Sequence, residues 1–391
     1  MATADVVTDL ATLVGFPTVS SRPNLALCAF VAERFEAMGF AIERFEDPEE
    51  TGKATLICRA GPEGEDGLVL SGHTDVVPVE GQPWSSDPFS LQRRGDRLHA
   101  RGAADMKGFL AAALAGLADL PLHQLRRQLV LVWTHDEEIG CQGSARLAEA
   151  LLQRRARLPS ACWIGEPTGM RILHQHAGHV AAEVRCHGQA AHSAYPHLGA
   201  NAVHAAVRVA EAIASHQADF DAAAAAEPGA VLAGRVPLNL ASLHGGDAIN
   251  IVPDHATLRI GFRPPPGCSH LPLVAAFERA VQSASLPAGT RVESRVLRVT
   301  PSLRTPLGLP LQRALDPHTA HAGQGDEAAG TAGFATDGGN LQRLGCAPLI
   351  FGPGRIEVAH QADEYVELDQ LHAAVSAIAA VTRSWTGVGA R

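Results

Sequence analysis

Short aliphatic runs that lead straight into polar residues recur along this chain. Helical patterns rich in Ala and Leu follow, over residues 107–120 and 144–152. Strands that alternate with helices predict an α/β fold, a mostly parallel sheet with helices on both faces. Such a sheet places ligands beyond the carboxyl ends of its strands. The runs, each with the polar cluster that follows it, are 68–72 with His73-Thr74-Asp75, 128–134 with Asp136-Glu137-Glu138, and 161–165 with Glu166-Pro167-Thr168.

The pattern changes near His179. Residues 180–186 alternate like a half-buried strand, residues 199–214 read as a long helix, and two more strand candidates precede a Pro-Pro-Pro-Gly break at 264–267. This pattern predicts an inserted α+β domain over residues 179–289. The catalytic domain would then consist of two parts, residues 1–178 and 290–391. Residues 365–382 read as the closing helix of the second part.

Composition excludes several classes of protein. The chain has 32 Lys and Arg against 41 Asp and Glu, a net charge of −9, and no dense basic block. Nucleic acid and anionic membranes are therefore poor partners. No apolar run approaches the roughly 20 residues that span a bilayer, and residues 1–16 read as a helix rather than a signal peptide. The seven cysteines form no Cys-x-x-Cys pair and read as reduced, buried thiols. A cytoplasmic enzyme is expected.

Three early residues have the chemistry of a metal site. His73 and Asp75 are two apart, so on an extended strand end they face the same side, where a carboxylate can orient an imidazole. A core or surface histidine is the alternative. Asp105 stands in a Gly-flanked segment before a helix, where a helix cap is an equally good interpretation.

The later acids and a late histidine complete a mixed oxygen and imidazole set. Glu137 and Glu138 are adjacent after an apolar strand, and they repel each other unless a cation or proton relieves the repulsion. A solvated turn is the alternative. Glu166 follows another apolar run, and His360 lies in a turn-rich segment. Two histidines with three carboxylates are too many for one tetrahedral ion, so we infer a dinuclear hydrolytic site.

The motifs, in this order, resemble those of the acetylornithine deacetylase and succinyl-diaminopimelate desuccinylase family of metal-dependent amidohydrolases and peptidases. The resemblance covers nearly the whole chain. The matching stretches are SGHTDVVP at 71–78, RGAADMKG at 101–108, DEE at 136–138, GEPT at 165–168, Gly188 to His192-Ser193, NIVP at 250–253, Arg263-Pro264, and Gly352-Pro353-Gly354 with His360.

The resemblance implies two divalent metal ions, with zinc as the first choice and cobalt as the alternative. It implies that His73 and Glu166 bind one ion and that Glu138 and His360 bind the other. Asp105 would bridge the two ions. In the family, the inserted domain forms a dimer and acts as a lid, so a homodimer is expected.

Further roles are implied for residues that do not bind metal. Asp75 would orient His73, and Glu137 would act as the general acid and base. His192, on the inserted domain, would reach the active site of the partner subunit. Asn250 and Arg263 match residues that grip the carboxylate of the substrate.

The substrate implied by the resemblance is a small N-acyl amino acid. Most features favour the deacetylase branch, which removes the acetyl group from N2-acetyl-L-ornithine in arginine biosynthesis. Two features depart from the pattern of the deacetylase branch. They are Ala177 and the segment 335–340 (ATDGGN), and the segment is closer to the desuccinylase form. Asp337 is a candidate to bind the distal ammonium group of the substrate, or else a turn aspartate.

Other functions remain open on the sequence alone. A succinyl-diaminopimelate desuccinylase, a dipeptidase or an aminoacylase would use the same mechanism. An inactive protein that retains metal as a binding or scaffold module is an alternative of another class. Glu137 argues against that alternative, because a general base has no structural role that glutamine could not share.

Overall fold

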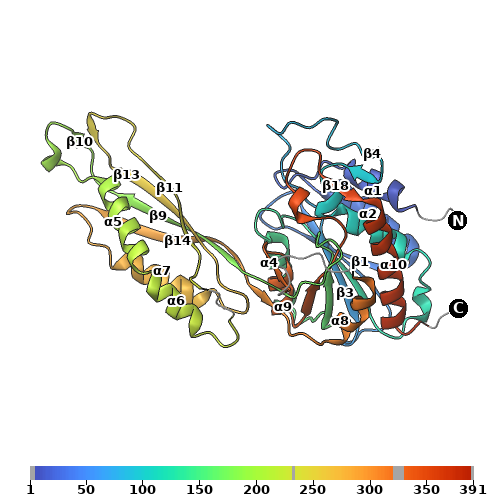
Figure 1. The fold of residues 1–391 in the computed structure, drawn as a ribbon. Coiled ribbons are helices and arrows are strands. Elements are labelled where there is room, and N and C mark those ends of the chain that lie inside the picture. Colours follow the sequence, from blue (N-terminus) through green and yellow to red (C-terminus); the bar gives the residue numbers. More distant parts are fainter. Residues whose placement is uncertain (1–4, 231–233, 320–329, 389–391) are drawn as a thin grey trace. The chain divides into compact units, whose positions relative to one another are not determined.

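The computed structural model describes residues 5–230, 234–319 and 330–388. The chain divides into two compact units (Figure 1). The first unit comprises Met1–His174, Thr305–Ala332 and Thr336–Arg391. The second unit comprises Gln175–Arg304 together with Gly333–Ala335.

A six-stranded, mostly parallel sheet forms the centre of the first unit. Strands β6, β3, β7 and β17 are parallel, whereas β2 pairs antiparallel with both of its neighbours, β1 and β6. Strands β3, β6 and β7 are buried along their whole length, as expected for strands covered on both faces. The predicted α/β fold is confirmed. The strand order is β1 (Ala41–Glu46), β2 (Ala54–Ala60), β6 (Leu129–Thr134), β3 (Leu68–His73), β7 (Ala161–Ile164) and β17 (Ala347–Ile350).

Helices cover both faces of this sheet because its strand residues alternate between two hydrophobic clusters. Leu70 and Leu131 belong to the cluster that includes α1, α2, α3, α8 and α10. Their neighbours Val69 and Val132 belong to the opposite cluster, with α4 and α9. The helices are α1 (Val6–Val14), α2 (Leu25–Met38), α3 (Gly108–Leu117), α4 (Gln142–Gln153), α8 (Pro310–Leu315), α9 (Gly338–Arg343) and α10 (Leu368–Trp385).

The segment predicted as one closing helix begins with a strand. Residues Tyr365–Glu367 form β18, which pairs with β5 (Arg97–His99), and β5 pairs with β4 (Gln92–Arg94). Helix α10 begins only at Leu368. A pairing partner far away in sequence therefore overrides the helical pattern at these residues, because cross-strand contacts decide the structure of short segments.

An antiparallel sheet of four strands forms the second unit, with helices α5, α6 and α7 supplying the rest of its hydrophobic core. The strand order is β11 (Leu238–Gly245), β13 (His255–Phe262), β9 (His179–His187) and β14 (Arg291–Thr300). The helices are α5 (Ala202–Ser215), α6 (Gln217–Ala225) and α7 (Leu271–Gln282). Shorter strands are β8 (Gln175–His176), β10 (Ala191–His192), β12 (Ile251–Val252) and β15 (Leu303–Arg304).

The second unit extends beyond the insertion predicted at residues 179–289. Strand β14 pairs with β9 from Arg291 to Thr300, so the segment after residue 289 completes the antiparallel sheet instead of returning to the first unit. The unit ends at Arg304. Sequence alternation did not reveal this because β14 is an edge strand with mostly exposed side chains.

The remaining short elements connect these larger ones. They are β16 (Thr331–Ala332), η1 (Ala103–Lys107), η2 (Leu122–Gln124), η3 (Pro196–Leu198), η4 (Asp316–His318) and η6 (Ile356–Val358). None of the helices in the described part of the chain combines the length and apolar character needed to cross a bilayer.

Candidate metal centre

The loops that follow the parallel strands carry most of the candidate site. Strand β3 ends at His73, while Glu138 and Glu166 lie in the segments after β6 and β7. His360 lies in the segment after β17. Because these strands are parallel, their carboxyl ends meet at one edge of the sheet. The sheet thereby gathers side chains that are far apart in sequence.

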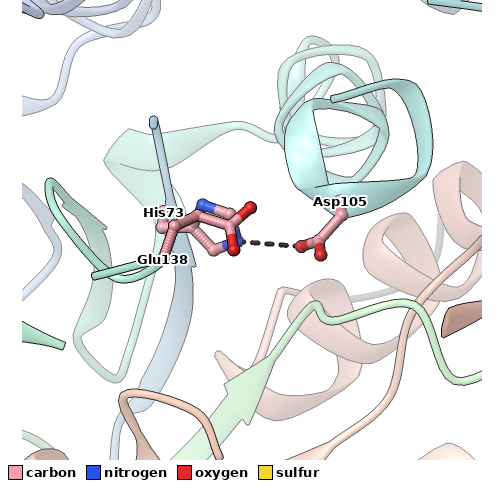
Figure 2. A group of neighbouring side chains, drawn as sticks. All are labelled: His73, Asp105 and Glu138. Atoms are coloured by element: carbon pink, nitrogen blue, oxygen red, sulfur yellow. Dashed lines mark hydrogen bonds and ion pairs between the residues drawn. The ribbon is translucent and has the colours of Figure 1, made fainter. Parts of the chain in front are cut away.

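Asp105 lies between the two histidines. Its Oδ1 is 3.0 Å from Nε2 of His73, and its Oδ2 is 3.3 Å from Nε2 of His360. Figure 2 shows the His73 imidazole and the Asp105 carboxylate facing each other. A carboxylate whose two oxygens face two histidines is arranged to be shared by a pair of cations.

Glu138 and His360 form a second pair of donors. Nε2 of His360 is 2.9 Å from Oε2 of Glu138. The other oxygen of Glu138, Oε1, is buried and has no hydrogen-bond partner among the described residues. A buried polar atom without a partner is unfavourable unless an ion or water satisfies it. This oxygen therefore fits a metal ligand.

Glu166 and Glu137 complete the group around His73. Nε2 of His73 is 3.9 Å from Oε2 of Glu166. Donor atoms of His73, Asp105 and Glu138 all lie within 4.8 Å of one another, close enough to hold one ion. A second such group consists of His73, Glu137 and Glu166. Imidazole nitrogen and carboxylate oxygen are donors that zinc accepts, so the residues present fit divalent cations.

These side chains, taken by themselves, hold protons that a cation would displace. Burial first, and the charge of Asp105 next, raise the pKa of Glu138 to about 7. Burial also raises the pKa of Glu137 and of Glu166 well above the usual range. Hydrogen bonds to Asp105 and Glu138 raise the pKa of His360 to about 10. Metal binding at such donors must therefore release protons.

Asp75 lies beside His73, as predicted, but its nearest contact with the imidazole is through the backbone. Nδ1 of His73 lies 2.9 Å from the backbone carbonyl of Asp75, and the carboxylate is farther away, at 3.6 Å. The Asp75 carboxylate instead accepts the backbone N–H groups of Glu137 (3.1 Å) and Glu138 (3.3 Å). It also accepts the Ser20 hydroxyl at 2.7 Å. Its backbone orients the imidazole, while its carboxylate holds the loop of the two glutamates.

Asp337 lies in the interior of the first unit rather than on an open loop. It is 2% exposed, and its Oδ2 accepts the Thr134 hydroxyl at 2.6 Å. The pKa of Glu137 is raised mainly by burial, and the negative charge of Asp337 raises it further. The contact of Asp337 with the ammonium group of a substrate stays a prediction, and its position also suits a supporting role near Glu137.

The other predicted substrate residues lie in the second unit, in two groups. His192 and Asn250 are neighbours, because β10 pairs with β12 and the Ser193 N–H donates to the Asn250 carbonyl at 3.0 Å. Arg263 directly follows the last residue of β13, whereas Asn250 directly precedes β12, which comes before β13 in the chain. All three are exposed. At about 3.3 Å per residue, β13 is about 25 Å long, and it lies between Arg263 and the segment that carries Asn250.

Several supporting residues were not found by sequence reasoning. Sγ of Cys141 donates to Oε1 of Glu137 at 3.3 Å, although the cysteines read as inert core thiols. Nζ of Lys53 donates to Oδ2 of Asp136 at 2.6 Å and so secures the start of the glutamate loop. Glu364 contacts the turn of Asp105. Closeness in sequence to a candidate site residue could have indicated two of them, since Cys141 follows Glu137 by four residues and Glu364 follows His360 by four.

Comparison with known proteins agrees with this geometry. The model of the peptidase family M20/M25/M40 matches residues 69–384. The chain belongs to this family. Membership of the M20 family confirms the predicted resemblance and the prediction of an enzyme that acts on amide bonds.

Relatives within the M20 family align over nearly the full length. An acetylornithine deacetylase of Edwardsiella ictaluri is 31% identical, covering 91% of this chain and 91% of the relative. An acetylornithine deacetylase of Myxococcus xanthus is 33% identical, covering 93% of this chain and 92% of the relative.

Solved M20 structures share the fold. An M20 family metallo-carboxypeptidase from Sulfolobus solfataricus superposes with a TM-score of 0.73 at 17% identity, covering 98% of this chain and 100% of its own. A dinuclear metal binding peptidase of the family from Bacillus subtilis gives a TM-score of 0.64 at 14% identity, with 98% of each chain covered. At these identities the likeness shows the fold alone.

We expect the affinity for zinc to fall as the pH is lowered. Between pH 8 and pH 6, Glu138, with a pKa of about 7, gains a proton, whereas His360, with a pKa of about 10, already carries one, and both protons compete with the cation. Binding should weaken at least about tenfold over this range, because the titration of Glu138 alone gives this change. Calorimetric titration in two buffers of different ionisation enthalpy would measure both affinity and proton release. Affinity that is independent of pH would contradict the expectation.

Proposed function

We propose that this chain is an acetylornithine deacetylase, a homodimeric dinuclear metal hydrolase that converts N2-acetyl-L-ornithine into L-ornithine and acetate in arginine biosynthesis. One observation carries the proposal. The five residues predicted as ligands lie together beside Glu137, in a chain whose relatives at 31% and 33% identity are acetylornithine deacetylases.

The metal ions are assigned to the donors described above. His73 and Glu166 would hold one ion, Glu138 and His360 the other, and Asp105 would be shared. Zinc is our first choice and cobalt the alternative. Divalent ions bound there polarise an acyl carbonyl and lower the pKa of water toward about 7.

Glu137 would move the proton in this reaction. Its backbone N–H is held by Asp75 and its Oε1 by the Cys141 thiol, so its carboxylate has a fixed position beside His73. Burial raises its pKa well above the usual range, which suits a group that both accepts and returns a proton. Glu137 would take a proton from the attacking water and deliver it to the departing amine nitrogen.

Residues of the second unit would bind the rest of the substrate. His192 would donate to the oxyanion that forms at the acyl carbon, an interaction worth about 3 kcal/mol in comparable sites. Asn250 and Arg263 would bind the α-carboxylate, Arg263 through a charge-assisted hydrogen bond.

The distance along β13 supports a dimer. Strand β13, about 25 Å long, lies between Arg263 and the segment that carries Asn250, whose neighbour is His192. A small acylated amino acid is far too short to contact both groups of a single chain. If both groups act on one substrate, they must come from two chains, with His192 and Asn250 supplied by the partner subunit.

Acetate release from acetylornithine should exceed succinate release from succinyl-diaminopimelate, and a chelator should abolish both. The desuccinylase is the alternative favoured by one observation, the ATDGGN segment at 335–340. Both assays use the same zinc-loaded protein, so protein quality does not affect their ratio. Greater succinate release would assign the desuccinylase function. Activity that persists after the metal is removed would refute the metal mechanism.

Glu137→Gln should reduce kcat by at least about a thousandfold, because the general base and proton donor are lost together. Metal content should stay near the wild-type level, as measured by elemental analysis after dialysis. The matched control is Glu149→Gln, on α4 outside the donor set, which should keep full activity. Loss of both metal and activity in Glu137→Gln would reassign Glu137 as a ligand. Full activity would remove Glu137 from the mechanism.

Two inactive variants should restore activity when they are mixed. Glu137→Gln disables the site of its own chain, while His192→Ala disables the site of its partner. After subunit exchange, half of the dimers in an equal mixture are mixed, and each mixed dimer has one intact site. Activity should therefore recover to about a quarter of wild type. No recovery despite exchange, confirmed with tagged subunits, would place His192 in its own chain's site or outside catalysis.

A further inference from the structure

A buried carboxylate, Glu364, holds the backbone of the turn that carries Asp105. Glu364 is 1% exposed. Its Oε1 accepts the N–H groups of Ala104 (2.9 Å) and Asp105 (3.0 Å). Its Oε2 accepts the N–H of Gly102 (3.0 Å) and the guanidinium of Arg101 (2.7 Å). Four donors thus converge on one carboxylate beneath a proposed bridging ligand.

The shape of this turn depends on Gly102. Its φ is +79°, and a Cβ there would lie 2.7 Å from Cγ1 of Val76. Only glycine combines this conformation with so close a neighbour. Successive N–H groups in such a turn point to one side and form an anion-binding concavity. Glu364 fills that concavity from within the protein, so the turn is fixed by an internal anion.

Arg101 extends the contacts from Asp105 to His360. While Nη1 of Arg101 binds Glu364, its Nη2 donates to Oε1 of Gln82 at 2.5 Å. Nε2 of Gln82 in turn donates to the backbone carbonyl of His360 at 2.9 Å. Nε1 of Trp84 also donates to Oε1 of Gln82, at 3.0 Å, which fixes the orientation of the amide.

His360 needs such a support more than the other proposed ligands. Its φ is +62°, a conformation that residues other than glycine adopt infrequently. Its side chain is 52% exposed, whereas those of Asp105 and Glu138 are 7% and 5% exposed. A half-exposed ligand in a strained backbone conformation persists only where neighbouring contacts determine it. The contact from Gln82 to its carbonyl is one of these.

We propose that Glu364, Arg101 and Gln82, here called the brace, are positioning residues that fix the separation of Asp105 and His360. The inference rests on the proposed metal centre and deepens it. Asp105 would be shared by both ions, whereas His360 belongs only to the ion that Glu138 also binds. The contact from Gln82 to His360 therefore sets mainly the affinity of that one ion.

The deciding variant is Gln82→Met, which keeps the length of the side chain and removes the three hydrogen bonds of the amide, to His360, Arg101 and Trp84. Gln82 is only half-buried, so the fold should be retained. Gln92→Met is the matched control, because Gln92 is an exposed glutamine whose amide bonds only to Ser90. Full-length chains, stripped of metal, would be titrated with zinc in a calorimeter, with cobalt absorption spectra as a second readout.

We expect Gln82→Met to weaken one of two binding events by about tenfold and to leave the other within about twofold, the usual scale for residues that support metal ligands. Gln92→Met should match wild type in both events. Equal weakening of both events by Gln82→Met, or no change in either, would overturn the brace. Glu364→Gln acts on the shared ligand Asp105 and should weaken both events; unchanged binding in that variant would also overturn it. If that variant does not fold, Gln82→Met decides alone.

The test separates the brace from the function on which it rests. It uses metal binding and no substrate, so an enzyme with a different acyl preference would give the same result. A wild-type chain that binds fewer than two ions would refute the proposed metal centre and the brace with it. A wild-type chain that binds two ions, with a Gln82→Met variant that binds them equally well, would refute the brace only.

Discussion

The crowding of buried carboxylates around His73 is the constraint on which the rest of the first unit depends. Asp105, Glu137, Glu138 and Glu166 all lie near one imidazole, and burial raises the pKa of the three glutamates. Removing several like charges from water is unfavourable unless protons or cations compensate them. A polypeptide keeps such an arrangement only if its scaffold is rigid, and a hydrolase that binds two cations has a direct use for it.

The scaffold obtains its rigidity from the sheet. Central strands such as β6 are buried on both faces, with Leu131 in one hydrophobic cluster and Val132 in the other. If such a strand slipped by one residue, every side chain would move to the opposite face of the sheet and the packing of both hydrophobic clusters would be lost. The fixed position of each strand end also fixes the position of the residues that follow it. The acidic side chains therefore occupy loops, but only within a few residues of a fixed strand end.

The sequence was informative where one physical signal dominated. Apolar runs followed by polar clusters predicted the parallel sheet, and the metal-binding chemistry of the clusters predicted which side chains would meet. It was less informative where a distant partner decides the outcome. Strand β18 forms because Tyr365 and Val366 pair with β5. Strand β14 forms because it pairs with β9 at the edge of the second sheet. The same limit applies to Asp75 and Asp337, whose residue types suit several roles and whose contacts come from segments far away in the chain.

The side chains that would bind metal cannot also hold themselves in place, because their oxygen atoms must remain available to cations. The support for them therefore comes from the backbone. Asp75 accepts the N–H groups of Glu137 and Glu138, and Glu364 accepts that of Asp105. Each supporting carboxylate is itself buried, and its negative charge is stabilised by backbone N–H groups and, for Glu364, by the Arg101 guanidinium as well. The two kinds of carboxylate differ only in what they accept, which is why residue type alone could not separate a ligand from its support.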